Sequence, residues 1–265
     1  GEEGTRCDPI LPAPARTGYR LSPAQTRIFT IESSRPASTL YVLPFAFWLN
    51  PVPSFDLLET AFNRLIDRHE PLRTSFGWDK NEPVQIVHPS VPFRLHRIEG
   101  DPDRIDDLTA TFAEPFDLSC PPLIRATAAS FRDGRMLLLL HLHHIIADGI
   151  SLSILMNDLM SLLAGRALTP LSLQYKDYCE WLHARDVSED REAYWFNRFQ
   201  DYSSTPDLPL DRPRTAARRY EGDTIALHWD EATAASVREL AARCGTTLHL
   251  TMLAAYYVLL SKLTG

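Results

Sequence analysis

An unbroken apolar run, Met136 to Leu140, leads directly into the segment HLHHIIADGIS, which spans residues 141 to 151. Such a run predicts a buried core strand, and the turn-forming pair Asp148-Gly149 predicts that this strand ends there. The segment places several titratable side chains at the end of a buried element. That combination constrains the fold and is the main indication of a functional site in the chain.

The adjacent histidines should differ in environment. Because side chains alternate faces along a strand, His143 should point to the same side as His141, and His144 to the opposite side. If one of the two neighbours lines a cavity, the other is held inside the structure. For His141 alone we favour a core residue, since a neutral imidazole with both nitrogens hydrogen-bonded costs little to bury.

Two other chemistries were weighed for this segment. Zinc is an alternative because imidazole and carboxylate are among its usual ligands. The spacing disfavours zinc, because Asp148 follows His143 by five residues, whereas metal hydrolases of this kind have a carboxylate two residues after the second His. In addition, no Cys or second His cluster completes a ligand shell. A Ser nucleophile is disfavoured because the chain has no G-x-S-x-G motif. We therefore expect no bound metal.

Four segments of the chain carry a resemblance. In chain order they are SPAQTR at 22–27, RHEPLRTSF at 68–76, HHIIADG at 143–149 and YKDYCEW at 175–181. They are similar to the SxAQxR, RHExLRTxF, HHxxxDG and YxDYxxW motifs of the condensation domains of nonribosomal peptide synthetases. The resemblance extends over residues 18 to 265.

The resemblance implies an α+β fold, with a mixed β-sheet and flanking helices in a lobe like that of chloramphenicol acetyltransferase. Condensation domains have two such lobes, so we expect this chain to be a fragment that is inactive alone. The expected segments are a linker or tail at 1–17, an N-terminal lobe with the HHxxxDG motif at 18–185, a crossover helix and Pro/Arg-rich loop at 186–222, and the beginning of a truncated C-terminal lobe at 223–265.

The resemblance also implies the reaction. Condensation domains form an amide bond between a donor acyl or peptidyl thioester and the amine of an acceptor aminoacyl thioester. The expected partners are the donor and acceptor peptidyl carrier proteins, whose 4'-phosphopantetheine arms hold the substrates, and an adjacent adenylation domain; no cofactor is expected to bind directly. An epimerisation domain and a non-catalytic docking or scaffold module remain open, and the motif looks most like the subtype that joins two L-residues.

Site residues follow from the motifs. His144, the second His, is expected to orient the acceptor amine and accept its proton, and the backbone N–H of Gly149 to support the developing oxyanion. Asp148 is expected to face inward and to fix the loop through a buried ion pair with Arg73 or Arg27. The predicted catalytic set is His144, His143, Asp148 and Gly149. Further residues are expected to be structural: Arg68, His69, Tyr175, Asp177 and Trp181.

Composition limits the other function classes. The net charge of −7, from 27 basic and 34 acidic side chains, argues against a nucleic-acid partner. The apolar stretch Leu248 to Leu263 is shorter than the roughly 20 residues of a membrane span and contains Lys262. We interpret it as a buried helix whose apolar face, without the second lobe, would promote self-association.

Cellular location is expected to be cytoplasmic. The N-terminal GEEG carries acid where a signal peptide has base followed by an apolar run. The four cysteines have no CxxC spacing, which favours a reducing compartment; they are Cys7, Cys120, Cys179 and Cys244.

Local patterns predict the remaining elements. Three of the expected helices are identified by their caps: Ser22, Ser54 and, after Gly149, Ser151. Four others are expected to span 102–113, 174–185, 189–200 and 231–243. The expected strands span 41–49, 84–88, 93–98 and 224–229, with a hairpin of 123–131 and 136–144 around Asp133-Gly134. Pro44 makes the first of these strands an edge strand or a bulge.

Overall fold

The computed structural model describes residues 8–35, 38–100, 114–185, 189–201, 208–213 and 225–264. The chain divides into two units, Gly1–Asp186 and Val187–Gly265, and each is described by itself. The predicted segment boundaries, at 17, 185 and 222, stay predictions.

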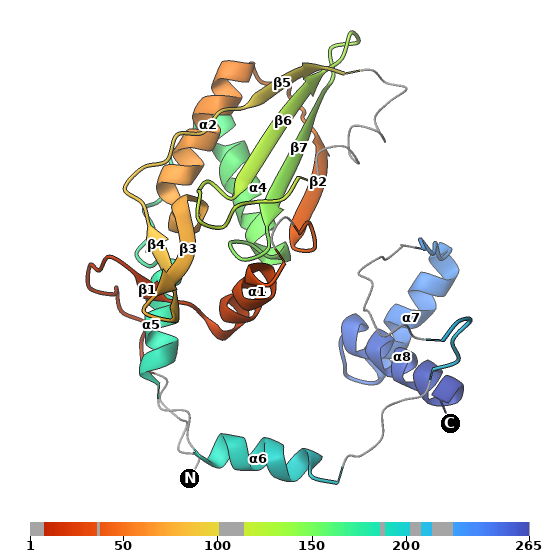
Figure 1. Ribbon diagram of the computed structural model, residues 1–265. Coiled ribbons are helices and arrows are strands. Elements are labelled where there is room, and N and C mark those ends of the chain that lie inside the picture. The colour runs from red at the N-terminus through yellow and green to blue at the C-terminus, as the bar shows by residue number, and fades with distance from the viewer. Residues whose placement is uncertain are drawn as a thin grey trace. The chain divides into compact units, whose positions relative to one another are not determined.

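A four-stranded mixed sheet forms the centre of the first unit, with strand order β2-β7-β6-β5 (Figure 1). The strands are β2 (Val42–Trp48), β5 (His96–Glu99), β6 (Ile124–Ser130) and β7 (Met136–His143). β5 and β6 run parallel, whereas the other pairs are antiparallel. Pro44 lies in β2, an edge strand of this sheet, as predicted, because proline has no N–H to offer a second neighbour.

The predicted hairpin of β6 and β7 is confirmed. The strands pair antiparallel from Ser130 opposite Met136 to Ile124 opposite Leu142, and Gly134 in the turn has a φ of 84°, which glycine adopts without strain. The predicted strand end at Asp148-Gly149 is wrong. β7 ends at His143, because the chain turns at once and the N–H of Ile146 bonds back to the carbonyl of His143.

Two helices, α2 (Phe55–Arg68) and α4 (Gly149–Leu163), cover one face of this sheet (Figure 1). The Ser54 side chain accepts a hydrogen bond from the N–H of Leu57 and caps α2, as predicted. The apolar stripe of α2 packs on alternate residues of β7; Leu58 and Leu142 are both fully buried. Each such side chain contributes roughly 1.5–3 kcal/mol by burial, which gives the site a rigid base.

A smaller sheet of strand order β1-β4-β3 adjoins this core. It consists of β1 (Tyr19–Arg20), β3 (Thr74–Asp79) and β4 (Glu82–Val87), and a short 3-10 helix, η1 (Glu70–Arg73), leads into β3. The sequence did not predict β3. Two further helices in this unit are α1 (Pro23–Ser33), with the predicted cap at Ser22, and α5 (Tyr175–Ala184).

The second unit contains the predicted helices α6 (Glu189–Phe199), α7 (Glu231–Arg243) and α8 (Leu248–Thr264). The predicted strand at 224–229 is wrong, since residues 225–229 have no regular secondary structure. The expectation that α8 is buried is also wrong: it contacts α7, yet none of its residues is buried. The predicted helix at 102–113 lies outside the described residues.

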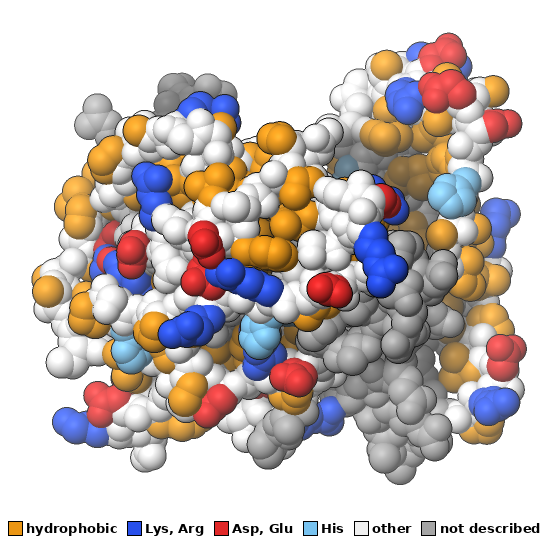
Figure 2. Space-filling model, turned by 90° about the horizontal axis from the view of Figure 1, so that it is seen from above, with side chains coloured by type: hydrophobic (Ala, Val, Ile, Leu, Met, Phe, Trp, Pro, Cys, Tyr) orange, Lys and Arg blue, Asp and Glu red, His pale blue; other side chains and the backbone are white. Residues whose placement is uncertain are grey.

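The distribution of surface charge and the length of the apolar helices are relevant to a nucleic-acid partner and to a membrane, respectively. Figure 2 shows basic and acidic side chains interspersed with apolar ones on the face that it displays. Among the described residues, no single helix is long and apolar enough to cross a membrane. The helices α7 and α8, bent by 100° at their junction, pass that test together by length and composition.

Candidate active site

His144 stands in the turn that follows β7, with its side chain exposed. Its backbone N–H donates to the carbonyl of Tyr41, 2.8 Å away, which ties the turn to the start of β2. Its ring Nδ1 lies 2.8 Å from the carbonyl oxygen of Ala147. Since a carbonyl oxygen only accepts, Nδ1 carries the proton in the neutral ring, and Nε2 is left as the proton acceptor.

His143 has the opposite arrangement. Its side chain is 1% exposed, and its Nδ1 accepts a hydrogen bond of 3.2 Å from the N–H of Ile145. Burial, reinforced by the neighbouring His144, lowers the pKa of His143 to about 4, so the ring is neutral with its proton on Nε2. That Nε2 is buried and has no hydrogen-bond partner among the described residues. The prediction that the two neighbours differ in environment is confirmed.

Asp148 does not make the expected ion pair. Its carboxylate caps α4 by accepting from the N–H and the hydroxyl of Ser151, at 2.8 and 2.7 Å. The backbone hydrogen bond from Ser151, followed by that of its hydroxyl, holds the pKa of this exposed carboxyl below its usual value. The inward, buried position predicted for Asp148 is therefore wrong, as is the prediction that Ser151 caps the helix. Aspartate is among the strongest N-cap residues, and here it precedes the first turn of α4.

The two arginines proposed as partners of Asp148 are engaged elsewhere or exposed. Arg73 lies 3.7 Å from the carboxylate of Glu70 and donates to the carbonyl of His88. Arg27 is exposed on α1. Neither ion pair with Asp148 is found in the described structure.

Gly149 begins α4 and is exposed. A Cβ atom at this position would meet no atom within 4 Å, so packing within the described part of the chain does not require glycine here. Its N–H belongs to the first turn of the helix, where the helix dipole favours negative charge. The expected oxyanion role of this N–H stays a prediction.

The first motif braces the turn that carries His144. The amide Nε2 of Gln25 donates to the carbonyl of Ile145 at 3.2 Å, while its Oε1 accepts from the N–H of Ser22 at 3.1 Å. The hydroxyl of Tyr175, in the fourth motif, donates to the Ser22 hydroxyl at 3.0 Å. Gln25 was not among the predicted site residues, although it is the glutamine of the SxAQxR motif.

The second motif joins the end of α2 to α4. Arg68 Nε and His69 Nε2 lie 2.9 and 2.8 Å from the same carboxylate oxygen of Asp158. Burial lowers the pKa of His69, and the contact with Asp158 opposes that shift. These contacts fix α4 relative to α2.

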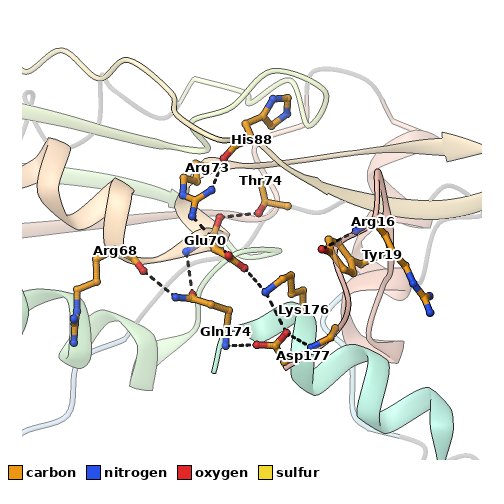
Figure 3. A network of polar contacts seen from close by, with 11 residues as sticks. Arg16, Tyr19, Arg68, Glu70, Arg73, Thr74, His88, Gln174, Lys176 and Asp177 are labelled. Carbon is orange, nitrogen blue, oxygen red and sulfur yellow. Dashed lines mark hydrogen bonds and ion pairs between the residues drawn. The ribbon is translucent and has the colours of Figure 1, made fainter. Parts of the chain in front are cut away.

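A polar network links the second motif to the fourth (Figure 3). Lys176 Nζ lies 2.8 Å from Glu70 and 3.1 Å from Asp177, and Asp177 also accepts from the backbone N–H groups of Gln174 and Ala13, at 2.7 and 2.9 Å. Asp177 is thus the N3 residue of α5, and its carboxylate accepts from the N–H of the N-cap residue Gln174. Neither Glu70 nor Gln174 was among the predicted site residues.

The segment before β1 takes part in the same contacts. Trp181 Nε1 donates to the carbonyl of Asp8 at 2.8 Å, and Arg16 forms an ion pair of 3.1 Å with Glu180. Residues 8–16 have no regular secondary structure, yet these contacts hold them against α5. Among the described residues, no group of His, Cys, Asp and Glu side chains is arranged to hold a metal ion.

Comparison with known proteins places this site in a family. The family description "Condensation domain" matches residues 15–265. The chain belongs to the condensation-domain family. Its fold is the chloramphenicol-acetyltransferase-like fold of condensation domains.

The relatives of this condensation domain are peptide synthetases. It is 38% identical over 259 residues to tyrocidine synthase 2 of Brevibacillus parabrevis, an alignment that covers 97% of this chain and 7% of that protein. It is 37% identical to bacitracin synthase 2 of Bacillus licheniformis, covering 96% of this chain and 10% of that protein. The chain thus spans a tenth or less of the length of these curated relatives.

Solved structures share the fold. One is the complex of the X-domain and OxyB from teicoplanin biosynthesis, with a TM-score of 0.81, 26% identity, and coverage of 97% of this chain and 59% of that chain. Another is a four-domain nonribosomal peptide synthetase bound to AMP and glycine, with a TM-score of 0.78 and 21% identity over 98% of this chain and 20% of that chain. The second likeness shows the fold alone.

Proposed function

We propose that this condensation domain forms an amide bond between a donor acyl or peptidyl thioester and the amine of an acceptor aminoacyl thioester. The observation that carries the proposal is the exposed His144 ring, whose Nδ1 is tied to the Ala147 carbonyl. This contact fixes both the ring orientation and the tautomer. The nitrogen that faces outward is therefore a base.

The reaction needs little more than positioning and one proton acceptor. The amine nitrogen attacks the thioester carbonyl, the carbon–sulfur bond breaks, and the thiol leaves. The attacking nitrogen becomes cationic in the tetrahedral intermediate. Nε2 of His144 accepts its proton and passes it to the departing sulfur, which leaves as the thiol. General-base catalysis contributes about 10²–10⁴-fold, and orientation of two tethered reactants contributes as much or more.

The other groups at the site have supporting roles in this proposal. We assign the Gly149 N–H, at the start of α4, to the developing oxyanion. Asp148 caps that helix, and His143 stays neutral inside the structure, where it shapes the turn. Gln25 holds the turn in place through the carbonyl of Ile145.

Substrates and partners belong to the same proposal. The relatives are synthetases, which supports donor and acceptor carrier proteins with phosphopantetheine arms and a neighbouring adenylation domain. The proposed subtype joins two L-residues. An epimerisation domain is an alternative that the described residues do not separate from condensation.

A docking module is the second candidate, and one finding favours it. The X-domain that shares this fold is found in a complex with OxyB, so that protein binds a partner protein through this kind of domain. For the present chain, the ordered base at His144 favours catalysis over docking alone.

The test uses the synthetase module that contains this chain, with both carrier proteins loaded. His144→Ala should lower single-turnover amide formation by about 10²-fold or more, while circular dichroism shows that the fold is kept. The matched control is His96→Ala, which removes an exposed histidine of β5 and should leave the rate unchanged. An unchanged rate in His144→Ala would show that His144 is not the base. A wild-type module that forms no amide with any loaded pair of carrier proteins would favour docking or epimerisation.

A further inference from the structure

A cavity of about 630 Å³ opens between α1, the end of β3 and residues 115–119, all within the first unit. Its walls are mainly aromatic and apolar, as expected for a ligand site. The large apolar side chains among the lining residues are Phe29, Phe76, Trp78, Phe116 and Leu118. No part of the proposed reaction uses this space.

One carboxylate is buried in the cavity wall. Glu32, near the end of α1, is 8% exposed, and its Oε1 atom has no hydrogen-bond partner within the part of the chain that the structure describes. Burial raises the pKa of Glu32, and a hydrogen bond with Ser38 opposes that shift. A buried carboxylate oxygen without a donor is costly, so this atom is an acceptor that a ligand would satisfy.

The charged side chains in the described lining are both carboxylic acids, Glu32 and Asp117. Hydrogen bonds from the Ser119 hydroxyl and N–H hold the pKa of Asp117 below its usual value, so this carboxyl is ionised. No Lys, Arg or His belongs to the described lining. Arg125 lies 3.9 Å from the centre of the Phe116 ring, and its guanidinium donates to the carbonyls of Glu114 and Pro115.

The cavity adjoins the turn that carries His144. Phe116 meets the ring of His143 edge-on, with the ring centres 6.1 Å apart. Phe29, Phe76 and Phe116 belong to the same buried cluster as Ile145, whose carbonyl Gln25 holds. A group bound in this cavity is therefore placed next to the element that positions the proposed base.

We infer that this cavity binds a primary alkylammonium group on an apolar chain, such as a lysine- or ornithine-like side chain of one of the joined substrates. Aromatic faces attract cations, and Oε1 of Glu32 supplies a hydrogen-bond acceptor that has no donor among the described residues. An acidic or neutral apolar group would leave Oε1 without a donor. The substrate part of this inference rests on the proposed function, whereas the binding part does not.

The test compares two small probes that differ only in the ammonium group, N-acetyl-lysine methyl ester and N-acetyl-norleucine methyl ester. By calorimetry on the whole chain, the lysine probe should bind at least tenfold more tightly. Glu32→Gln keeps the side chain's shape and removes its charge, and should abolish that preference. The matched control is Glu99→Gln, an exposed carboxylate on β5, which should keep the preference.

A second variant provides the test if Glu32→Gln does not fold. If Glu32→Gln loses its circular dichroism signal, Asp117→Asn at the same cavity should reduce the preference severalfold. His144→Ala should keep it, so binding is separable from amide formation. The inference is overturned if the two probes bind equally, if neither binds, or if the preference survives folded Glu32→Gln; none of these results bears on whether His144 is the base.

Discussion

The first and second units differ in what their apolar helices touch. In α2, the stripe that includes Leu58, Phe62 and Ile66 is buried against the sheet and α4. In α8, an even more apolar helix, the large side chains remain exposed, with Leu259 at 53%. Both helices form where the local sequence predicts them. Helix formation is thus a local property, whereas burial depends on which other elements are present.

Replacing a leucine with alanine should have very different effects on the free energy of unfolding in the two units. Leu58→Ala in α2 should lower the free energy of unfolding by about 2–5 kcal/mol, because it leaves a cavity in a packed core. Leu259→Ala in α8 should change it by about 0.5 kcal/mol or less, as is typical of exposed positions. Urea titrations followed by far-UV circular dichroism measure both. Equal losses would mean that α8 is packed as tightly as α2.

Acid should destabilise the first unit through His143. Its pKa of about 4 in the folded state lies below the ordinary 6.5, so the unfolded chain binds a proton that the folded chain refuses. This contribution to stability is complete above pH 6.5 and falls as the pH drops to 4, by roughly 3 kcal/mol in all.

The variant His143→Gln cannot take up that proton. Its stability should therefore depend less steeply on pH than that of the wild type between pH 6.5 and 4, in unfolding titrations at several pH values. Parallel curves for the two proteins would show that His143 titrates normally and is not held neutral by burial.

Loss of the α4 cap should have a smaller effect. Asp148→Ala should cost about 0.5–2 kcal/mol, the usual value of an N-cap, rather than the larger loss expected for a broken buried ion pair. Asp148→Ser, which keeps a capping oxygen, should recover most of the stability. A loss of about 3–5 kcal/mol in the alanine variant, with no recovery in the serine variant, would restore the ion-pair interpretation.

The smallest effect on stability is expected from the hydrogen bond between Tyr175 and Ser22, which joins the fourth motif to the first. Tyr175→Phe removes the hydrogen bond to Ser22 and should cost about 0.5–1.5 kcal/mol. Tyr178→Phe, on the same helix, is the matched control and should be close to neutral. Melting temperatures measured side by side compare the two, and a Tyr178 effect as large as that of Tyr175 would remove the special role of this contact.

Local patterns predicted much of the fold. The hairpin of β6 and β7 follows from Asp133-Gly134 between two apolar runs, and α2 follows from Ser54 and a repeating apolar stripe. β3 was missed because TSFGWD has no strong alternation and gains its structure by pairing with β4. The strand predicted at 224–229 failed for the converse reason, since a β-pattern needs a neighbouring strand and none is described beside it.

The site was predicted in part. Side-chain alternation gave the difference between His143 and His144, although β7 ends before His144 and a turn, not the strand, exposes it. The predicted partner of Asp148 was wrong because the nearby N–H and hydroxyl of Ser151 compete with a distant arginine for the carboxylate. The local contact has the lower entropic cost. Tertiary contacts such as Gln25 with Ile145 join residues far apart in the chain, and no local pattern indicates them.

The proton positions on the two adjacent histidines test the central claim most directly. Long-range proton–nitrogen NMR correlations of the imidazole rings at pH 8 distinguish a protonated from an unprotonated ring nitrogen. We predict that His144 carries its proton on Nδ1, with Nε2 unprotonated, and that His143 shows the reverse. A proton on Nε2 of His144 would contradict the account, because that ring would present a donor, not a base, to the acceptor amine.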